Sequence, residues 1–211
     1  MLENYLVYLQ LIDEKLNKFF TKQKPFIYCK KGCGLCCKNA QFPYSQIELE
    51  YLMIGVRQLD EEKKSIISQN INKLKQQKAE HPGKDFKYDC PFLINNECSV
   101  YNYRGIICRS FGLLNISAKG KIRVPFCCFQ GLNYSNVMDD CGTKISEEKY
   151  RKLNVEEEPL AFNTSYEFLT DPDFATGFHF DFNEKKPLIN WFIEEDNKEE
   201  IRHIISMKQA S

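Results

Sequence analysis

Apolar side chains recur along much of the chain at the spacing of helices. Residues 2–23 repeat them every three or four positions and precede Pro25, which predicts an amphipathic helix that ends before the proline. The same spacing predicts a last helix over residues 188–208 and a short helical turn within residues 101–110. We therefore expect helices to make up most of the fold.

Capping residues mark three further helix starts. Ser45 and Glu48 form an S-x-x-E capping box before an apolar run. Asp60 precedes a helical pattern over residues 61–78, and Ser146 stands in the same way before a short charged segment. Because such side chains satisfy the first free N–H groups of a helix, each is predicted to begin one.

Strands are expected to be few and short. Residues 90–101 predict a tight hairpin, because Asn95 and Asn96 tolerate the positive φ values that its turn needs. A second hairpin is predicted over residues 116–124, and alternation of apolar and polar residues predicts a strand over 178–182. The predicted fold class is α+β, mostly helical.

Charge is divided unevenly between the two parts of the chain, although its 211 residues carry no net charge. Residues 1–154 contain 24 basic and 16 acidic side chains, a net charge of +8. Residues 155–211 contain 5 and 13, a net charge of −8. We predict a domain over residues 1–154 with an acidic, aromatic extension, residues 155–211, packed on it. The alternative is a basic face that binds an anionic partner.

The hydropathy pattern predicts no membrane span and no secretory signal. No run of 18 apolar residues occurs, and the N-terminal apolar stretch contains acidic residues and no small-residue cleavage site. We therefore expect a cytoplasmic protein without membrane contact, whose thiols stay reduced.

Ten cysteines lie between Cys29 and Cys141, four of them within the nine residues CKKGCGLCC at positions 29–37. Three interpretations compete. Disulfides are disfavoured by the adjacent cysteine pairs and by a reducing compartment. Inert burial suits Cys141, but not four cysteines among lysines and glycines. Metal binding explains the clustering, because thiolates two to three residues apart on a glycine-containing loop can converge on one centre.

The predicted metal ligands are the cysteines of the clustered groups. Their number suits two four-thiolate centres, or one centre with a redox pair, and either Cys127 or Cys128 is the last ligand. The histidines are scattered along the chain and none is predicted as a ligand. With Cys128 taken as the last ligand, the predicted set is Cys29, Cys33, Cys36, Cys37, Cys90, Cys98, Cys108 and Cys128.

The favoured cofactor is an iron–sulfur cluster of the 4Fe–4S type. The spacing Cys29-x3-Cys33-x2-Cys36 is known from iron–sulfur proteins. Zinc is the alternative, although structural zinc sites more often pair two C-x2-C knuckles and this chain has one. Radical SAM enzymes share the spacing, but here it follows a helix and no strand–helix series comes after it.

The cysteine pattern resembles the CxxxCxxCC cysteine-cluster family of the YkgJ type, which is regarded as a zinc- or iron-chelating domain. The resemblance covers roughly residues 29–131, where CKKGCGLCC is followed by CPFLINNECSVYNYRGIICRSFG. Gly105 stands where the family usually has proline, so a looser turn is expected there. The residues of the second stretch that match are Cys90, Pro91, Leu93, Cys98, Tyr101, Arg104, Cys108 and Arg109.

Three of the matching residues, Tyr101, Arg104 and Arg109, are predicted to bind the cofactor. The arginines can donate hydrogen bonds toward cluster sulfurs or bind an anionic substrate. The alternative is that they form structural ion pairs or cover apolar surface with their stems.

These patterns together predict short hairpins and loops organised around cysteine-ligated metal. The predicted function is metal binding with a structural, redox or sensing role. One alternative is an iron–sulfur enzyme that modifies a protein or peptide, for example by lysine N-methylation, because the flagellin lysine-N-methylases carry a similar cysteine motif. The second is an adaptor for an anionic partner. Nucleic acid is not expected, since the sequence has no basic helix with interleaved aromatic residues.

Overall fold

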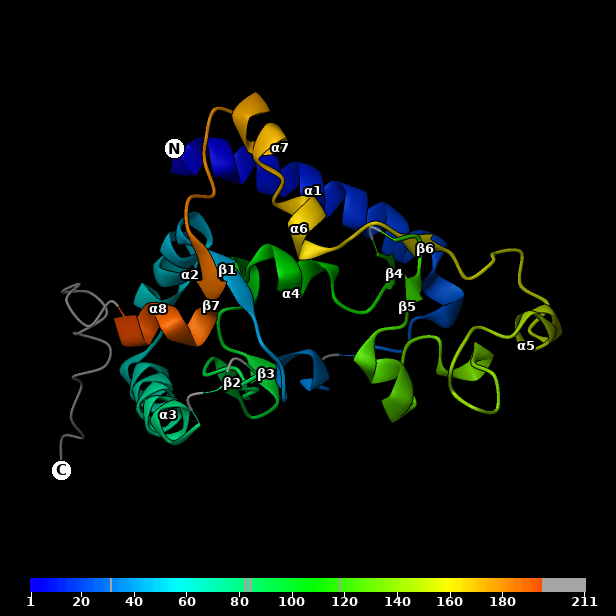
Figure 1. Cartoon of the computed structure of the whole chain (residues 1–211), viewed down its shortest axis with the longest axis horizontal. Coiled ribbons are helices and arrows are strands. Elements are labelled where there is room, and N and C mark those ends of the chain that lie inside the picture. Colours follow the sequence, from blue (N-terminus) through cyan, green and yellow to red (C-terminus); the bar gives the residue numbers. More distant parts are fainter. Residues whose placement is uncertain (31, 82, 84, 118, 195–211) are drawn as a thin grey trace. The chain divides into compact units, whose positions relative to one another are not determined.

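The computed structural model is a mostly helical α+β structure with short strands, as the sequence predicts. It divides into two compact units, whose elements are labelled in Figure 1. Unit 1 comprises residues 1–30 and 106–181, and unit 2 comprises residues 31–105 and the chain from residue 182 onward. The residues that the structure describes are 1–30, 32–81, 83, 85–117 and 119–194.

Unit 1 is built along the long N-terminal helix α1 (Leu2–Lys22), which confirms the predicted helix. The buried Gln23 follows it and fastens a later segment to the helix end: Leu160 N donates to Gln23 Oε1 at 2.8 Å, and Gln23 Nε2 donates to Glu158 O at 2.9 Å. The buried face of α1 carries Tyr5, Tyr8, Leu9, Ile12 and Leu16.

A small three-stranded sheet lies in unit 1. Strand β4 (Leu114–Ile116) pairs antiparallel with β5 (Ile122–Arg123) and parallel with β6 (Ala161–Phe162). The predicted second hairpin is therefore confirmed, and Gly120 in its turn has a φ of +72°. Strand β6 is an edge strand, and a long connection separates it in sequence from β5.

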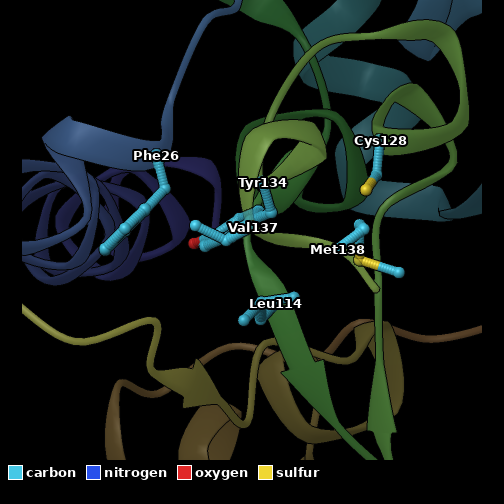
Figure 2. Close-up of a cluster of buried hydrophobic side chains, with 6 residues drawn as sticks. All are labelled: Phe26, Leu114, Cys128, Tyr134, Val137 and Met138. Atoms are coloured by element: carbon cyan, nitrogen blue, oxygen red, sulfur yellow. The ribbon is translucent and has the colours of Figure 1, made fainter. Parts of the chain in front are cut away.

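A cluster of buried apolar side chains forms the core beside this sheet (Figure 2). Phe26 and Tyr134 stack with their ring centroids 5.9 Å apart, and Tyr134 N donates to Phe26 O at 2.7 Å. The Tyr134 hydroxyl donates to Gln23 Oε1 at 3.2 Å, so this buried phenol has a polar partner. The cluster consists of Phe26, Leu114, Cys128, Tyr134, Val137 and Met138.

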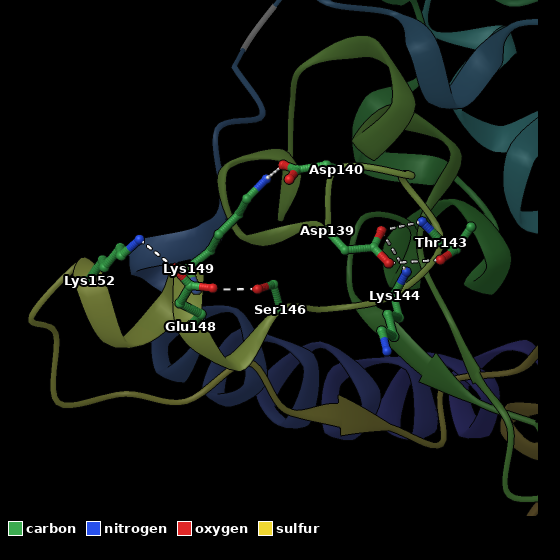
Figure 3. Close-up of polar contacts among 8 residues, drawn as sticks. All are labelled: Asp139, Asp140, Thr143, Lys144, Ser146, Glu148, Lys149 and Lys152. Atoms are coloured by element: carbon green, nitrogen blue, oxygen red, sulfur yellow. Dashed lines mark hydrogen bonds and ion pairs between the residues drawn. The ribbon is translucent and has the colours of Figure 1, made fainter.

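The remaining helices of unit 1 are short. They are α4 (Ile106–Ser110), α5 (Glu147–Lys152), α6 (Tyr166–Leu169) and α7 (Pro172–Gly177). Ser146 caps α5 as predicted, with Lys149 N donating to its Oγ at 3.3 Å, and ion pairs surround this helix (Figure 3). The predicted helix starts are thus confirmed even where the helix has few turns.

The predicted strand over residues 178–182 is wrong. Phe178 closes α7, His179 has a φ of +58°, and the described chain between α7 and β7 (Lys185–Pro187) contains no strand. Phe180 packs edge-on against Tyr5, with ring centroids 5.7 Å apart. Phe178 and Phe180 therefore both pack against Tyr8 of α1 from an irregular segment instead of forming one face of a strand.

Within its described residues, unit 2 combines three α-helices with two small sheets. Strand β1 (Pro43–Ser45) pairs antiparallel with β7 and leads into α2 (Gln46–Arg57), while α3 (Glu61–Glu80) packs against α8 (Leu188–Glu194). Trp191 is buried in α8 and donates from Nε1 to Tyr44 O at 3.0 Å, which joins α8 to β1. The rest of the last predicted helix lies outside the described residues.

Both predicted caps of unit 2 are confirmed. The backbone N and Oγ of Ser45 donate to Glu48 Oε2 at 2.9 and 2.7 Å, and Glu48 is fully buried. Asp60 accepts from Lys63 N at 2.8 Å at the start of α3. Within the described part of the chain, every helix is too short or too polar to cross a membrane.

Candidate metal centre

The cysteine loop of unit 2 is shaped by glycines. Gly32 and Gly34 have φ values of +83° and +60°, which residues with a side chain rarely adopt. They lead into a 3₁₀ helix over Leu35–Cys37, where Cys37 N donates to Gly34 O at 2.9 Å. The tight turn places Cys33, Cys36 and Cys37 on one short loop.

This loop is bonded to the segment that carries the next cysteine. Cys90 N donates to Cys37 O at 2.8 Å, and Asn39 N donates to Asp89 Oδ1 at 2.9 Å. Ala40 and Tyr88 exchange two backbone hydrogen bonds, each 3.1 Å long. The loop and the hairpin segment therefore approach through a row of backbone bonds that needs no bound ion.

The predicted hairpin is confirmed and carries Cys98. Strand β2 (Leu93–Ile94) pairs antiparallel with β3 (Glu97–Cys98), so that Leu93 faces Cys98. Its turn residues Asn95 and Asn96 have φ values of +52° and +61°. The turn also contacts the cysteine loop, because a Cβ built on Gly34 would lie 3.2 Å from both Asn96 O and Leu93 Cδ1.

Three thiols of unit 2 influence one another. The Cys36 and Cys37 sulfurs lie 3.8 Å apart. The hydrogen bond with Cys37, followed by burial, raises the pKa of the Cys36 thiol, and the nearby charge of Arg104 acts in the opposite direction. Burial raises the pKa of the Cys98 thiol as well; Cys36 adds to this increase, and Arg104 opposes it. The positive charge of Arg104 therefore offsets only part of the increase, and both thiols are favoured in their neutral form.

Arg104 is held beside the hairpin by Tyr101. The guanidinium carbon lies 3.7 Å from the centroid of the Tyr101 ring, and Arg104 Nη1 donates to Tyr101 O at 3.4 Å. Tyr101 itself is 61% exposed, so its ring covers the arginine from the solvent side. Arg104 is thus positioned to act electrostatically on Cys36 and Cys98, whereas Tyr101 acts through Arg104.

The other predicted ligands belong to unit 1. Cys29 is exposed, and its backbone N donates to Asn133 Oδ1 at 2.9 Å. Cys108 is half-buried on α4. Cys127 and Cys128 are both buried on a 3₁₀ helix over Phe126–Gln130, and burial raises the pKa of the Cys128 thiol. Cys128 belongs to the apolar cluster of Figure 2.

Arg109 has an ion-pair partner in unit 1. Its Nη1 lies 2.5 Å from Asp13 Oδ2 of α1, and the arginine side chain is 8% exposed. This pair provides the structural role that was the alternative to cofactor binding. Two other contacts escape sequence reasoning: Asn133 accepts from the backbone of Cys29, and the Tyr44 hydroxyl accepts from Gly105 N at 2.9 Å. Neither belongs to a local sequence pattern.

The ligand set as a whole remains a prediction. None of the ten cysteines, all of which lie within the described residues, forms a disulfide bond. Five of the eight predicted ligands belong to unit 2 and three to unit 1. Among the described residues, no three Cys, His, Asp or Glu side chains are arranged as a group that could hold a metal ion. The structure supports a candidate centre through two features: the close Cys36 and Cys37 sulfurs, and the backbone hydrogen bond from Cys90 to Cys37.

A glycine-shaped loop with three cysteines and a hairpin segment with two define a cysteine-cluster domain. Comparison with known families agrees: a model of the CxxCxxCC family, described as a "Putative zinc- or iron-chelating domain", matches residues 28–129. This match agrees with the resemblance that the cysteine spacing indicates. No curated protein and no solved structure matched the chain in the same comparisons.

Proposed function

We propose that unit 2 binds a single zinc or iron ion through cysteine thiolates. The observation that carries this proposal is the separation of 3.8 Å between the Cys36 and Cys37 sulfurs. Two thiolates on a tetrahedral ion, with metal–sulfur bonds of about 2.3 Å, are about 3.8 Å apart. The two sulfurs therefore already have the spacing of two ligands on one ion.

The remaining ligands of this centre come from the same unit. Cys98 is the third, because it lies opposite Leu93 in the hairpin that contacts the cysteine loop at Gly34. Cys33 and Cys90 are the candidates for the fourth, since Cys33 shares the loop and Cys90 is bonded to Cys37 through the backbone. Four thiolates around a divalent ion carry a net charge of −2, and the charge of Arg104 offsets part of it.

A closed four-thiolate centre favours a structural or redox role. It leaves no open coordination position for water or substrate, unlike a hydrolytic zinc site. Zinc in this position would stabilise the loop and the hairpin, whereas iron would also carry one electron. Residues 33–37 and 90–98 are the segments that the ion would stabilise most directly.

An iron–sulfur cluster is the second candidate, favoured by the spacing Cys29-x3-Cys33-x2-Cys36. In a four-iron cluster each thiolate binds a different iron, so adjacent cysteines do not both act as ligands of one iron. Cys36 would then be the ligand and Cys37 would lie beside the cluster. The two candidates thus differ in what they require of Cys37.

The test is metal and sulfide analysis of protein purified without oxygen. We expect one zinc or iron per chain, no acid-labile sulfide, and loss of most metal from both Cys36→Ser and Cys37→Ser. The matched control is Cys141→Ser, which replaces an exposed cysteine outside the clustered groups and should retain the metal. Iron with equimolar sulfide, retained in Cys37→Ser, selects the cluster. Unchanged metal content in Cys36→Ser contradicts both candidates.

A further inference from the structure

An apolar pocket in unit 1 is lined by residues of α1, β6, α6 and α7. These elements are labelled in Figure 1. Its volume is about 360 Å³, and nearly all of its exposed lining is apolar. Ile12 and Leu16, which are buried on α1, form part of its lining. None of its lining residues is a cysteine, so the proposed metal centre does not account for it.

The walls of the pocket are fixed by contacts at both ends. At one end Phe19 stacks on Phe162 with ring centroids 4.0 Å apart. At the other end Tyr8 packs edge-on against Phe178, at 5.2 Å, and its buried hydroxyl donates to Leu169 O at 2.7 Å. The pocket is therefore formed in advance, which lowers the entropic cost of filling it.

Its rim is apolar and remains exposed to solvent. Phe168 on α6 and Phe174 on α7 are 40% and 41% exposed, and their rings meet edge to face with centroids 5.5 Å apart. A ligand that covered these two rings would remove apolar surface from water, which favours binding.

One charged side chain lines the pocket, Lys15 of α1. Among the residues that the structure describes, the Lys15 side chain forms no ion pair or hydrogen bond. The two acidic side chains next to it in the sequence have other partners: Asp13 pairs with Arg109, and Glu14 accepts a hydrogen bond from Gln10. The cation thus stands at the edge of an apolar cavity with no acidic side chain to neutralise it.

We infer that this pocket binds a monocarboxylate with an apolar tail. The tail would fill the space between α1 and the aromatic rings, and the carboxylate would pair with the Lys15 ammonium at the rim. The volume lies at the lower end of the range for small-molecule sites, which suits a medium-length chain. A dianion or a fully polar ligand would meet a single cation and a lining that is mostly apolar.

The test uses octanoate as probe and octan-1-ol as its uncharged match, with binding to the full chain followed by calorimetry. We expect octanoate to bind and octanol to bind more weakly. Lys15→Gln should weaken octanoate about tenfold, the value of one hydrogen bond to a charged group, and leave octanol unchanged. Lys18→Gln is the matched control, since it removes a charge from an exposed position of α1 outside the pocket.

A second variant tests the location. Leu11→Trp enlarges a half-buried lining residue and should abolish binding of both probes while retaining the far-UV dichroism of the parent. The inference is overturned by absence of octanoate binding at millimolar concentration, by equal affinity of both probes, or by binding that survives Leu11→Trp. Because the readout is independent of metal content, its failure leaves the proposed metal centre untouched.

Discussion

The backbone N–H of Cys90 donates to the carbonyl oxygen of Cys37 at 2.8 Å. This bond joins the cysteine loop to the hairpin segment without using a thiol. The two segments are therefore held together before any ion binds, and the sulfurs remain available as ligands. Such an arrangement lowers the entropic cost of metal binding, because the loop and the hairpin have already lost part of their conformational entropy in folding.

Metal removal is the first prediction from this relationship. A chelator should lower the melting temperature of the protein, because the ion links the loop to the hairpin. It should leave most of the helical far-UV dichroism at low temperature, since α1, α2 and α3 contain no predicted ligand. A chelator should not lower the melting temperature of Cys36→Ser further. Complete unfolding of the chelated parent would contradict a site held in advance by the backbone.

The close contact between Gly34 and the hairpin gives a second prediction. Gly34→Ala should destabilise the protein by about 2–4 kcal/mol, because the added Cβ meets Asn96 O and Leu93 at 3.2 Å in a left-handed conformation. Gly32→Ala is the control: it has a positive φ as well, but nothing lies within 4 Å of its Cβ. Its cost should be about 1–2 kcal/mol. Equal costs in urea unfolding would show that the contact does not matter.

Gly105 stands where the cysteine-cluster family that the chain resembles usually has proline. Its backbone N donates to the Tyr44 hydroxyl at 2.9 Å, and a Cβ would lie 2.7 Å from Tyr44 Cζ. Proline has no N–H to donate and no room for its ring here. The glycine is therefore required by the tyrosine that packs on it, and the turn is held closely instead of being looser as expected.

We predict that Gly105→Pro destabilises the protein by about 3 kcal/mol or more. Gly105→Ala, which keeps the donor, should cost about 1–3 kcal/mol from overpacking alone. Gly83→Ala, at a glycine with open space around it, serves as the control. In a Tyr44→Phe background the proline should cost less, because no hydroxyl is left without its donor. An unchanged cost there, measured by chemical denaturation, would contradict the role of the hydrogen bond.

Local patterns explain which parts of the fold could be predicted. The span of α1, the Ser45–Glu48 cap and the Asn95–Asn96 turn depend on residues close in sequence, and all three were predicted correctly. The alternation over residues 178–182 misled, because spacing cannot distinguish one face of a strand from phenylalanines that pack against a helix from an irregular segment.

In the candidate site, too, local features could be predicted and long-range contacts could not. The cysteine loop and hairpin were predictable because the thiols cluster in sequence and the turn residues are local. The Asp13 partner of Arg109 and the Tyr44 partner of Gly105 were not, since each joins positions far apart in the chain. Register between distant segments depends on tertiary packing, which a single sequence does not reveal.

The ion pair of Arg109 with Asp13 gives a prediction that separates its two possible roles. Asp13→Ala should lower stability by about 1 kcal/mol, a modest value because the carboxylate is 38% exposed. Metal content should stay unchanged if Arg109 serves the fold and not the centre. Glu14→Ala, on the exposed side of α1, should change stability by less than about 0.5 kcal/mol. Loss of metal from Asp13→Ala would instead connect Arg109 to the site.

The last prediction concerns pH and the turn before α5. Asp139 accepts from Thr143 N at 2.7 Å, from Thr143 Oγ1 at 2.8 Å and from Lys144 N at 3.3 Å (Figure 3). These bonds, first of all the one from the Thr143 backbone, lower the pKa of the Asp139 carboxyl. Because the folded pKa is below the unfolded one, the stabilisation is present at neutral pH and is lost as pH falls through the folded value.

Asp139→Asn should therefore destabilise the protein at pH 7 and make a progressively smaller difference below about pH 4, where the unfolded carboxyl begins to be protonated. Asp140→Asn is the matched control, since its carboxylate is 94% exposed and pairs with Lys149 on the surface. Urea unfolding of the three proteins across this range provides the measurement. A difference between Asp139→Asn and the parent that stays constant down to pH 3 would mean that the turn depends on the shape of the side chain and not on its charge.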